Sequence, residues 1–208
     1  VPHEINPRAY ASLAEAFAHG VGRFRDRPAF TSLGATLTYA DVDQKSRELA
    51  AYLQQHCGLA RGDRIAVMMP NVLQYPVALF GILRAGMVVV NVNPLYTPRE
   101  LEHQLKDSGA KAIVILENFA HVLQQVLGST PVRHVITTQV GDMLPRPKRW
   151  IVNLVLKKVK KMVPAWRIAG AIRFRAALAR GATTAIRPVD VTREDIAFLQ
   201  YTGGTTGV

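Results

Sequence analysis

Short apolar runs separated by helical patterns constrain the fold of this 208-residue chain more than any other feature. The runs cover residues 64–69, 87–90, 112–116, 134–137 and 196–199. A strand that alternates apolar and polar residues exposes one face, whereas a mostly apolar strand is typical of burial on both faces. Such strands, alternating with helices, predict an α/β fold with a layered, mostly parallel sheet and helices on both faces.

The intervals between the runs carry the signals of helices. Helices are predicted at residues 40–55, 72–84, 98–108 and 119–127, a helical pattern opens at residue 12, and short strands are predicted at 29–31 and 36–38. Thr97 and Glu100 mark a helix start, because the threonine can cap it, a proline suits the first helical position and the glutamate completes a capping box. Thr38 is a second candidate cap.

Residues 201–208, which read YTGGTTGV, form the one segment that indicates ligand chemistry. Glycine permits positive φ angles and close approach of a ligand, since it has no Cβ. Successive backbone N–H groups can form a concave anion site, to which threonine hydroxyls add donors. The segment lacks the lysine of a Walker A loop, and no G-x-G-x-x-G occurs. A flexible terminal turn is the alternative, but a position after a strand favours a ligand site.

Composition limits the class of protein. With 49% hydrophobic residues there is material for one large domain or two small ones. The single cysteine, Cys57, excludes an internal disulfide and fits a reducing compartment, and the glycine after it predicts a structural place at a helix end. The first residues lack the pattern of a signal peptide, and no stretch has the character of a spanning helix, so a cytoplasmic protein is expected.

Known catalytic motifs are missing from the sequence. It contains no G-x-S-x-G nucleophile elbow and no H-E-x-x-H. The six histidines are scattered without the spacing of metal ligands. We therefore predict no catalytic residue and no metal ligand in this chain.

Residues 146–180 carry the whole excess of positive charge. The formal net charge is +11, and this segment holds eleven of the 26 Lys and Arg but none of the 15 Asp and Glu. A basic amphipathic helix is predicted at 151–163, ending before Pro164, and a second amphipathic stretch at 166–178. Three interpretations are open: a helix packed on the sheet with a solvated basic face, which we favour somewhat, a membrane-surface element, and, weakest, nucleic-acid binding.

Residues 201–208 also match the start of the phosphate-loop signature of adenylate-forming enzymes, which include acyl-CoA synthetases, luciferases and peptide-synthetase adenylation domains. Two longer blocks resemble the long-chain fatty-acid–CoA ligases of bacteria. They are residues 70–86 (PNVLQYPVALFGILRAG) and 90–101 (VNVNPLYTPREL). The resemblance runs along nearly the whole chain, so the loop indicates the superfamily and the blocks indicate the ligases.

This resemblance implies a two-step reaction on a long-chain fatty acid. ATP and the acid give an acyl-adenylate and pyrophosphate, and coenzyme A then displaces AMP to give the thioester. ATP, Mg²⁺ and coenzyme A are the implied cofactors, because donors and a metal ion stabilise the charge on the reacting phosphate. The residues assigned to cofactor binding are Tyr201, Thr202, Gly203, Gly204, Thr205, Thr206, Gly207 and Val208.

The resemblance also predicts the organisation of the chain. Residues 1–208 correspond to the N-terminal part of the AMP-binding domain, its first subdomain, with 146–180 as a basic amphipathic helical insertion. The metal-binding glutamate, the ribose-binding aspartate and the catalytic lysine of the family lie past residue 208, so the chain alone is expected to be inactive.

The expected partners follow from the same comparison. Related ligases are often dimers, so a homodimer is one expected state of the protein. An anionic membrane surface is a candidate partner of residues 146–180, which would make the protein peripheral on the inner face of the cell membrane, and no nucleic-acid partner is expected. Two alternatives to the fatty-acid ligase stay open: another adenylate-forming acid–CoA ligase, or a non-catalytic basic module that associates with membranes.

Overall fold

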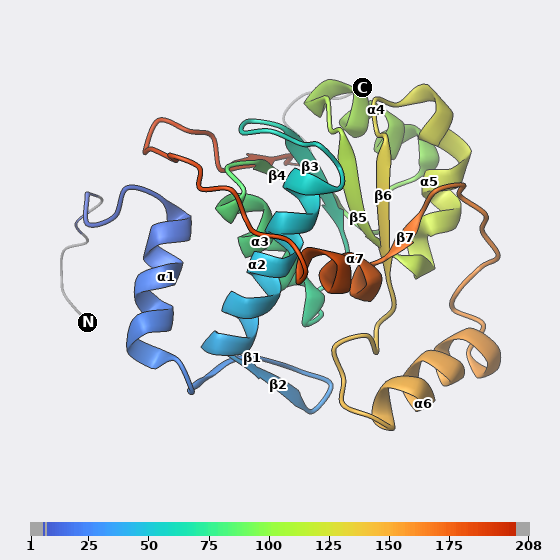
Figure 1. Ribbon diagram of the computed structural model, residues 1–208. Coiled ribbons are helices and arrows are strands. Elements are labelled where there is room, and N and C mark those ends of the chain that lie inside the picture. Colours follow the sequence, from blue (N-terminus) through green and yellow to red (C-terminus); the bar gives the residue numbers. More distant parts are fainter. Residues whose placement is uncertain (1–5, 7, 203–208) are drawn as a thin grey trace.

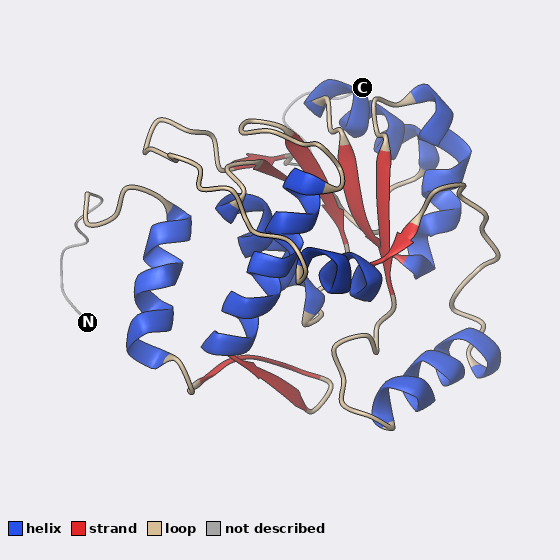
Figure 2. Cartoon of the chain, in the orientation of Figure 1, coloured by secondary structure: helices blue, strands red, loops and turns tan. Residues whose placement is uncertain are grey.

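A six-stranded parallel sheet forms the centre of the computed structural model, which describes residue 6 and residues 8–202 (Figures 1 and 2). The strand order is β7-β6-β5-β3-β4-β8, and every neighbouring pair is parallel. The strands are β3 (Arg64–Met68), β4 (Val88–Asn91), β5 (Ala112–Leu116), β6 (His134–Thr138), β7 (Ile172–Arg173) and β8 (Phe198–Gln200). The parallel sheet expected from the apolar runs is confirmed.

Helices cover both faces of this sheet, as expected. Along β3, Ile65 and Val67 enter one core, whereas Ala66 and Met68 enter the other. Figure 1 shows α2, α3 and α7 on one side of the sheet, with α4 and α5 on the other. Their bounds are α2 (Tyr39–Gln55), α3 (Gln74–Arg84), α4 (Pro98–Ser108), α5 (Ala120–Val126) and α7 (Phe174–Gly181). Alternate residues of one strand thus stabilise two separate layers.

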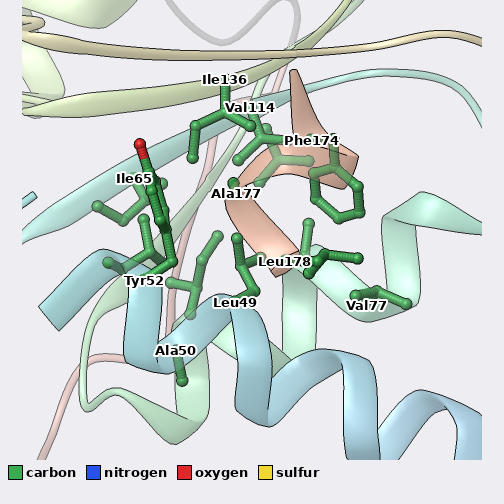
Figure 3. Close-up of a cluster of buried hydrophobic side chains, with 14 of the residues drawn as sticks. Leu49, Ala50, Tyr52, Ile65, Val77, Val114, Ile136, Phe174, Ala177 and Leu178 are labelled. Carbon is green, nitrogen blue, oxygen red and sulfur yellow. The ribbon is translucent and has the colours of Figure 1, made fainter. Parts of the chain in front are cut away.

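The first core lies between the sheet and helices α2, α3 and α7. Figure 3 shows Leu49 of α2 and Phe174 of α7 converging on Val114 of β5. The helices approach closely, because a Cβ added at Gly181 would lie 1.8 Å from the carbonyl oxygen of Glu48. Glycine at this position therefore lets α7 lie directly against the α2 backbone.

Capping boxes begin two of the helices: the box at Thr97 and Glu100 is the predicted one, and at Thr38 the predicted cap is part of a second box. The Thr38 side chain accepts from the N–H of Asp41 at the start of α2, and the Asp41 carboxylate accepts in return. At the start of α4, Thr97 and Glu100 make the same exchange. Each box satisfies donors that the first helical turn leaves without partners.

A helix and a hairpin precede the sheet in the chain. Helix α1 (Leu13–Phe24) packs through Phe17, whose ring stacks on Phe80 of α3 at a centroid distance of 3.8 Å. Strands β1 (Pro28–Ser32) and β2 (Ala35–Thr38) then form an antiparallel hairpin. Short 3₁₀ turns, η1 (Glu117–Phe119) and η2 (Leu127–Ser129), flank α5, so the helix expected at 119–127 is shorter than predicted.

The basic segment departs from the expected single helix. Helix α6 (Lys148–Leu154) continues as a π-helical turn, η3 (Val155–Val159), rather than as an α-helix reaching Val163. The Lys160 N–H donates to the Val155 carbonyl, and Lys161, at φ 50°, turns the chain away. A left-handed residue ends helical geometry, which is why the helix stops before Pro164.

The second half of the basic segment joins the main fold. Residues 166–178 do not form one amphipathic stretch, because Ile172 and Arg173 make strand β7 beside β6. Helix α7 follows, with Phe174 and Ala177 fully buried in the first core. The early part, α6 and η3, lies apart from the sheet in Figure 1. Arg149 is the one buried residue of α6.

We expect Phe174→Ala to lower the free energy of unfolding by about 3–5 kcal/mol, because it removes a fully buried aromatic ring and leaves a cavity. Urea unfolding followed by circular dichroism measures this change. Phe30→Ala is the matched control, since Phe30 lies in the hairpin and is 37% exposed. Equal losses in the two variants would contradict the place of α7 in the core.

Candidate functional site

The order of the strands marks one edge of the sheet as the place for a ligand. From β3 the chain passes to β4 on one side, then returns to β5 on the other side. Loops that leave neighbouring parallel strands in opposite directions open a crevice at the carboxyl ends, where ligands of open α/β sheets bind. The candidate site is therefore the carboxyl edge of the sheet.

Strand β8 brings the glycine- and threonine-rich segment to this edge. It pairs with β4 in the register Val89↔Phe198 and Asn91↔Gln200. Tyr201 and Thr202 consequently leave the sheet beside the carboxyl end of β4. Thr202 is exposed, and residues 203–208 lie outside the described part of the chain, so their assignment to cofactor binding stays a prediction.

A chain of polar side chains fixes the end of β4 against the end of β8. The Asn91 Nδ2 donates to the Gln200 Oε1 at 2.9 Å, and the Tyr75 hydroxyl donates to the Asn91 Oδ1 at 3.0 Å. The buried side chain of Gln104, on α4, donates to the Asn91 carbonyl at 2.8 Å. Helices from both faces of the sheet thus position the residue beside the start of the loop.

Tyr201 is partly buried against the second core, the one that Ala66 and Met68 of β3 enter. Its ring packs against that core, and its hydroxyl donates to the Asp107 carboxylate of α4. Burial raises the pKa of Tyr201 to about 12, and the neighbouring Asp107 adds to the effect. The phenol is therefore an anchor for the segment that follows, while a contact with polyphosphate stays a prediction.

A second polar cluster lies at the ends of β5 and β6. The Glu117 carboxylate, 2% exposed, accepts from Arg173 Nη1 at 3.1 Å and from Gln139 Nε2 at 2.8 Å. Asn153 of α6 donates to the Gln139 Oε1 at 3.0 Å. A buried carboxylate needs such partners. Sequence reasoning missed this cluster, although a glutamate directly after an apolar strand was a signal for it.

Neither the cysteine nor the potential metal-ligating side chains give a sign of catalysis. Burial raises the pKa of the Cys57 thiol to about 11, which agrees with the structural place predicted for it. Across residue 6 and residues 8–202, no three His, Cys, Asp or Glu side chains lie close enough together to hold a metal ion.

Two cavities open away from the carboxyl edge. One, of about 280 Å³, lies between the start of α1 and residues 191–197. The other, of about 500 Å³, lies beside the beginnings of β3 and β4 and is lined by Arg64 and Val88. Neither is lined by Thr202. Asp107, the partner of Tyr201, also lines the second cavity, which otherwise lies beside the strand beginnings.

The fold and this polar edge define an α/β domain arranged to receive a ligand where the strands end. Residues 17–208 match the family described as AMP-binding enzymes, and the chain belongs to that family. The chain is 58% identical, over all 208 residues, to a protein named long-chain-fatty-acid–CoA ligase from Salmonella typhimurium. It is 36% identical over 208 residues to a protein of the same name from Bacillus subtilis. It spans 37% of the length of each.

Solved structures share the fold. The anthranilate CoA ligase AuaEII in complex with anthranoyl-AMP matches 95% of this chain with a TM-score of 0.75 and 17% identity, over 33% of its own length. A long-chain-fatty-acid-CoA ligase from Archaeoglobus fulgidus matches 99% of this chain with a TM-score of 0.71 and 22% identity, over 37% of its own length. The fold is therefore that of the N-terminal domain of adenylate-forming enzymes, as expected.

We expect alkaline titration to find the raised pKa of Tyr201. Because this folded-state pKa lies above the ordinary value of 10.0, the stability it contributes is present below pH 10 and is lost as the pH rises through 12. Asp107→Asn keeps an acceptor but removes the charge, so it lowers the pKa of Tyr201 part of the way, since burial remains.

Tyrosinate absorbance as a function of pH measures the pKa of Tyr201. The difference between the parent chain and Tyr201→Phe assigns the titration to this residue. Tyr52 serves as an internal control, because its pKa is also raised to about 12, first by burial and then by Cys57. A Tyr201 that titrated at 10 in the unaltered chain would contradict the anchoring bond.

Proposed function

We propose that the protein to which this chain belongs is a long-chain fatty-acid–CoA ligase. The observation that carries the proposal is the 58% identity over all 208 residues to the ligase of Salmonella typhimurium. In the proposed reaction, ATP and a fatty acid give an acyl-adenylate and pyrophosphate. Coenzyme A then displaces AMP and forms the thioester.

The carboxyl edge of the sheet supports a role in holding ATP. Asn91, Gln200 and the anchored Tyr201 fix the end of β8, after which Thr202 follows. We assign the polyphosphate contacts to this segment, whose backbone N–H groups and threonine hydroxyls are the donors that phosphate oxygens need. Mg²⁺, when bound, supplies charge stabilisation at the phosphates, and coenzyme A is the acceptor of the acyl group.

The proposed organisation places residues 1–208 in the N-terminal part of the AMP-binding domain. The chain spans 37% of the relatives' length, and the structure supplies no metal cluster within its described residues. We therefore expect the 208-residue chain to bind nucleotide weakly and to show no turnover by itself.

In the full-length protein, we expect pyrophosphate release that requires both ATP and a long-chain fatty acid. Thr205→Ala should lower kcat by about 100- to 1,000-fold, because removing one donor to developing charge has that cost. Coupled detection of pyrophosphate measures it. Thr183→Ala is the control, since Thr183 lies exposed after α7 and its hydroxyl donates to the Arg180 carbonyl of the same turn.

The same assay separates the alternatives. Faster activation of an aryl acid or an amino acid than of a long-chain fatty acid would make the protein another adenylate-forming ligase. Turnover by the 208-residue chain alone would contradict its proposed incompleteness.

Helix α6 favours a second role, peripheral association with an anionic membrane. Its side chains Trp150, Ile151 and Leu154 are 59%, 57% and 61% exposed, although helices of globular domains normally bury such residues. Four exposed lysines follow, at positions 157, 158, 160 and 161. No helix in the described part of the chain has both the length and the apolarity to cross a bilayer. We propose a place on the inner face of the cell membrane, as a monomer or a homodimer.

We expect Lys157→Glu with Lys158→Glu to weaken binding to anionic vesicles at least about tenfold, since each lysine near such a surface contributes about 1 kcal/mol. Vesicle flotation at low and high salt measures the change. Arg133→Glu with Arg187→Glu makes the same charge change at exposed sites outside the basic segment and away from the carboxyl edge. Equal losses in both double variants, or no response to salt, would contradict a specific role for α6 and η3.

A further inference from the structure

The tip of the β1–β2 hairpin holds a leucine in an unfavourable conformation. Leu33 has φ 51° and is followed by Gly34 at φ 67°, which is the geometry of a tight two-residue hairpin turn. Asparagine or aspartate normally occupies the first of these positions, because a left-handed conformation strains larger side chains. Leu33 is also 51% exposed. Neither local geometry nor core packing accounts for a leucine here.

The hairpin tip is attached to the start of α6. The Lys148 ammonium donates to the Leu33 carbonyl, and a Cβ added at Gly34 would lie 3.0 Å from the Lys148 Nζ. Residues 115 positions apart in the chain are thus brought together. In Figure 1, the hairpin and α6 lie along the same lower side of the molecule.

Both elements are fastened to the carboxyl edge of the sheet. The Ser32 hydroxyl donates to the carbonyl of Asn71, which lies just past β3, at 3.4 Å. On the other side, the Gly141 N–H donates to the Asn153 Oδ1 at 2.8 Å, which ties α6 to the loop after β6. The hairpin tip and α6 therefore have a fixed position relative to the strand ends.

Cations surround the exposed apolar side chains of α6. The guanidinium groups of Arg146 and Arg149 each lie 5.6 Å from the centre of the Trp150 ring. Val159 and Met162, 69% and 55% exposed, alternate with the four lysines that follow α6. No acidic residue occurs between positions 146 and 180. Exposed apolar side chains interleaved with exposed lysines, in a segment without acidic residues of its own, match an anionic lipid surface better than a protein partner.

We propose that Leu33 and the exposed apolar side chains of α6 form one docking surface for an anionic phospholipid bilayer. The inference rests on the proposed membrane role of α6 and adds the hairpin as a second point of insertion. Two separate insertion points set the orientation of the protein, with the carboxyl edge of the sheet toward the lipid. Insertion of Leu33 into the bilayer would then explain its strained backbone, since persistent backbone strain often marks a functional position.

The test compares Leu33→Asn with Leu13→Asn. Leu13, on α1, is 50% exposed, so the two substitutions remove leucine side chains of nearly equal exposure. Asparagine accepts the left-handed conformation, so Leu33→Asn should keep or raise the melting temperature, and a loss of binding cannot then come from unfolding. Binding is measured with vesicles of phosphatidylcholine alone and of phosphatidylcholine with phosphatidylglycerol.

We expect Leu33→Asn to weaken binding to the anionic vesicles roughly fivefold, because less apolar area is buried in the interface, while Leu13→Asn leaves it unchanged. Unaltered binding by Leu33→Asn, with the parent chain bound, would overturn the role of the hairpin but keep the membrane role of α6. Failure of the parent chain to bind anionic vesicles would overturn both. Equal losses in the two variants would show that the hairpin has no special place.

Discussion

Strands β3, β4 and β5 are covered on both faces, and most of the structure depends on this double burial. Alternate residues of β3 enter two separate cores, so helices must return across both sides of the sheet. Crossovers between parallel strands are right-handed, so α3 on one face and α4 on the other go with β4 and β5 on opposite sides of β3. This change of direction opens the carboxyl edge. The faces that the helices cover, together with the handedness of the crossovers, thus determine where the crevice opens.

Features encoded by neighbouring residues could be predicted from the sequence. The apolar runs predicted the strands of the sheet except β7, and the caps at Thr38 and Thr97 predicted two helix starts, because each signal spans only a few positions. The π-helical turn after α6 could not be predicted, since it depends on where Lys161 turns the chain. The family resemblance came from contiguous blocks, and the match of residues 17–208 to AMP-binding enzymes confirms it.

The candidate site was likewise predictable only in its local part. Its terminal segment was visible from glycine and threonine content, but its supports come from distant parts of the chain. Tyr201 meets Asp107 across 94 positions, and Glu117 meets Arg173 across 56. Such pairs require the strand order, which the pattern of apolar residues does not specify. The carboxyl edge therefore combines a local motif with a scaffold that tertiary packing assembles.

The central claim is that β8, paired with β4, delivers residues 202–208 to the phosphates of ATP. A crystal structure of the full-length protein with a non-hydrolysable ATP analogue tests it most directly. We predict phosphate oxygens within hydrogen-bonding distance of backbone N–H groups in residues 202–208, with the bonds Asn91–Gln200 and Tyr201–Asp107 retained. Phosphates bound elsewhere, for example in the cavity between α1 and residues 191–197, would contradict the account.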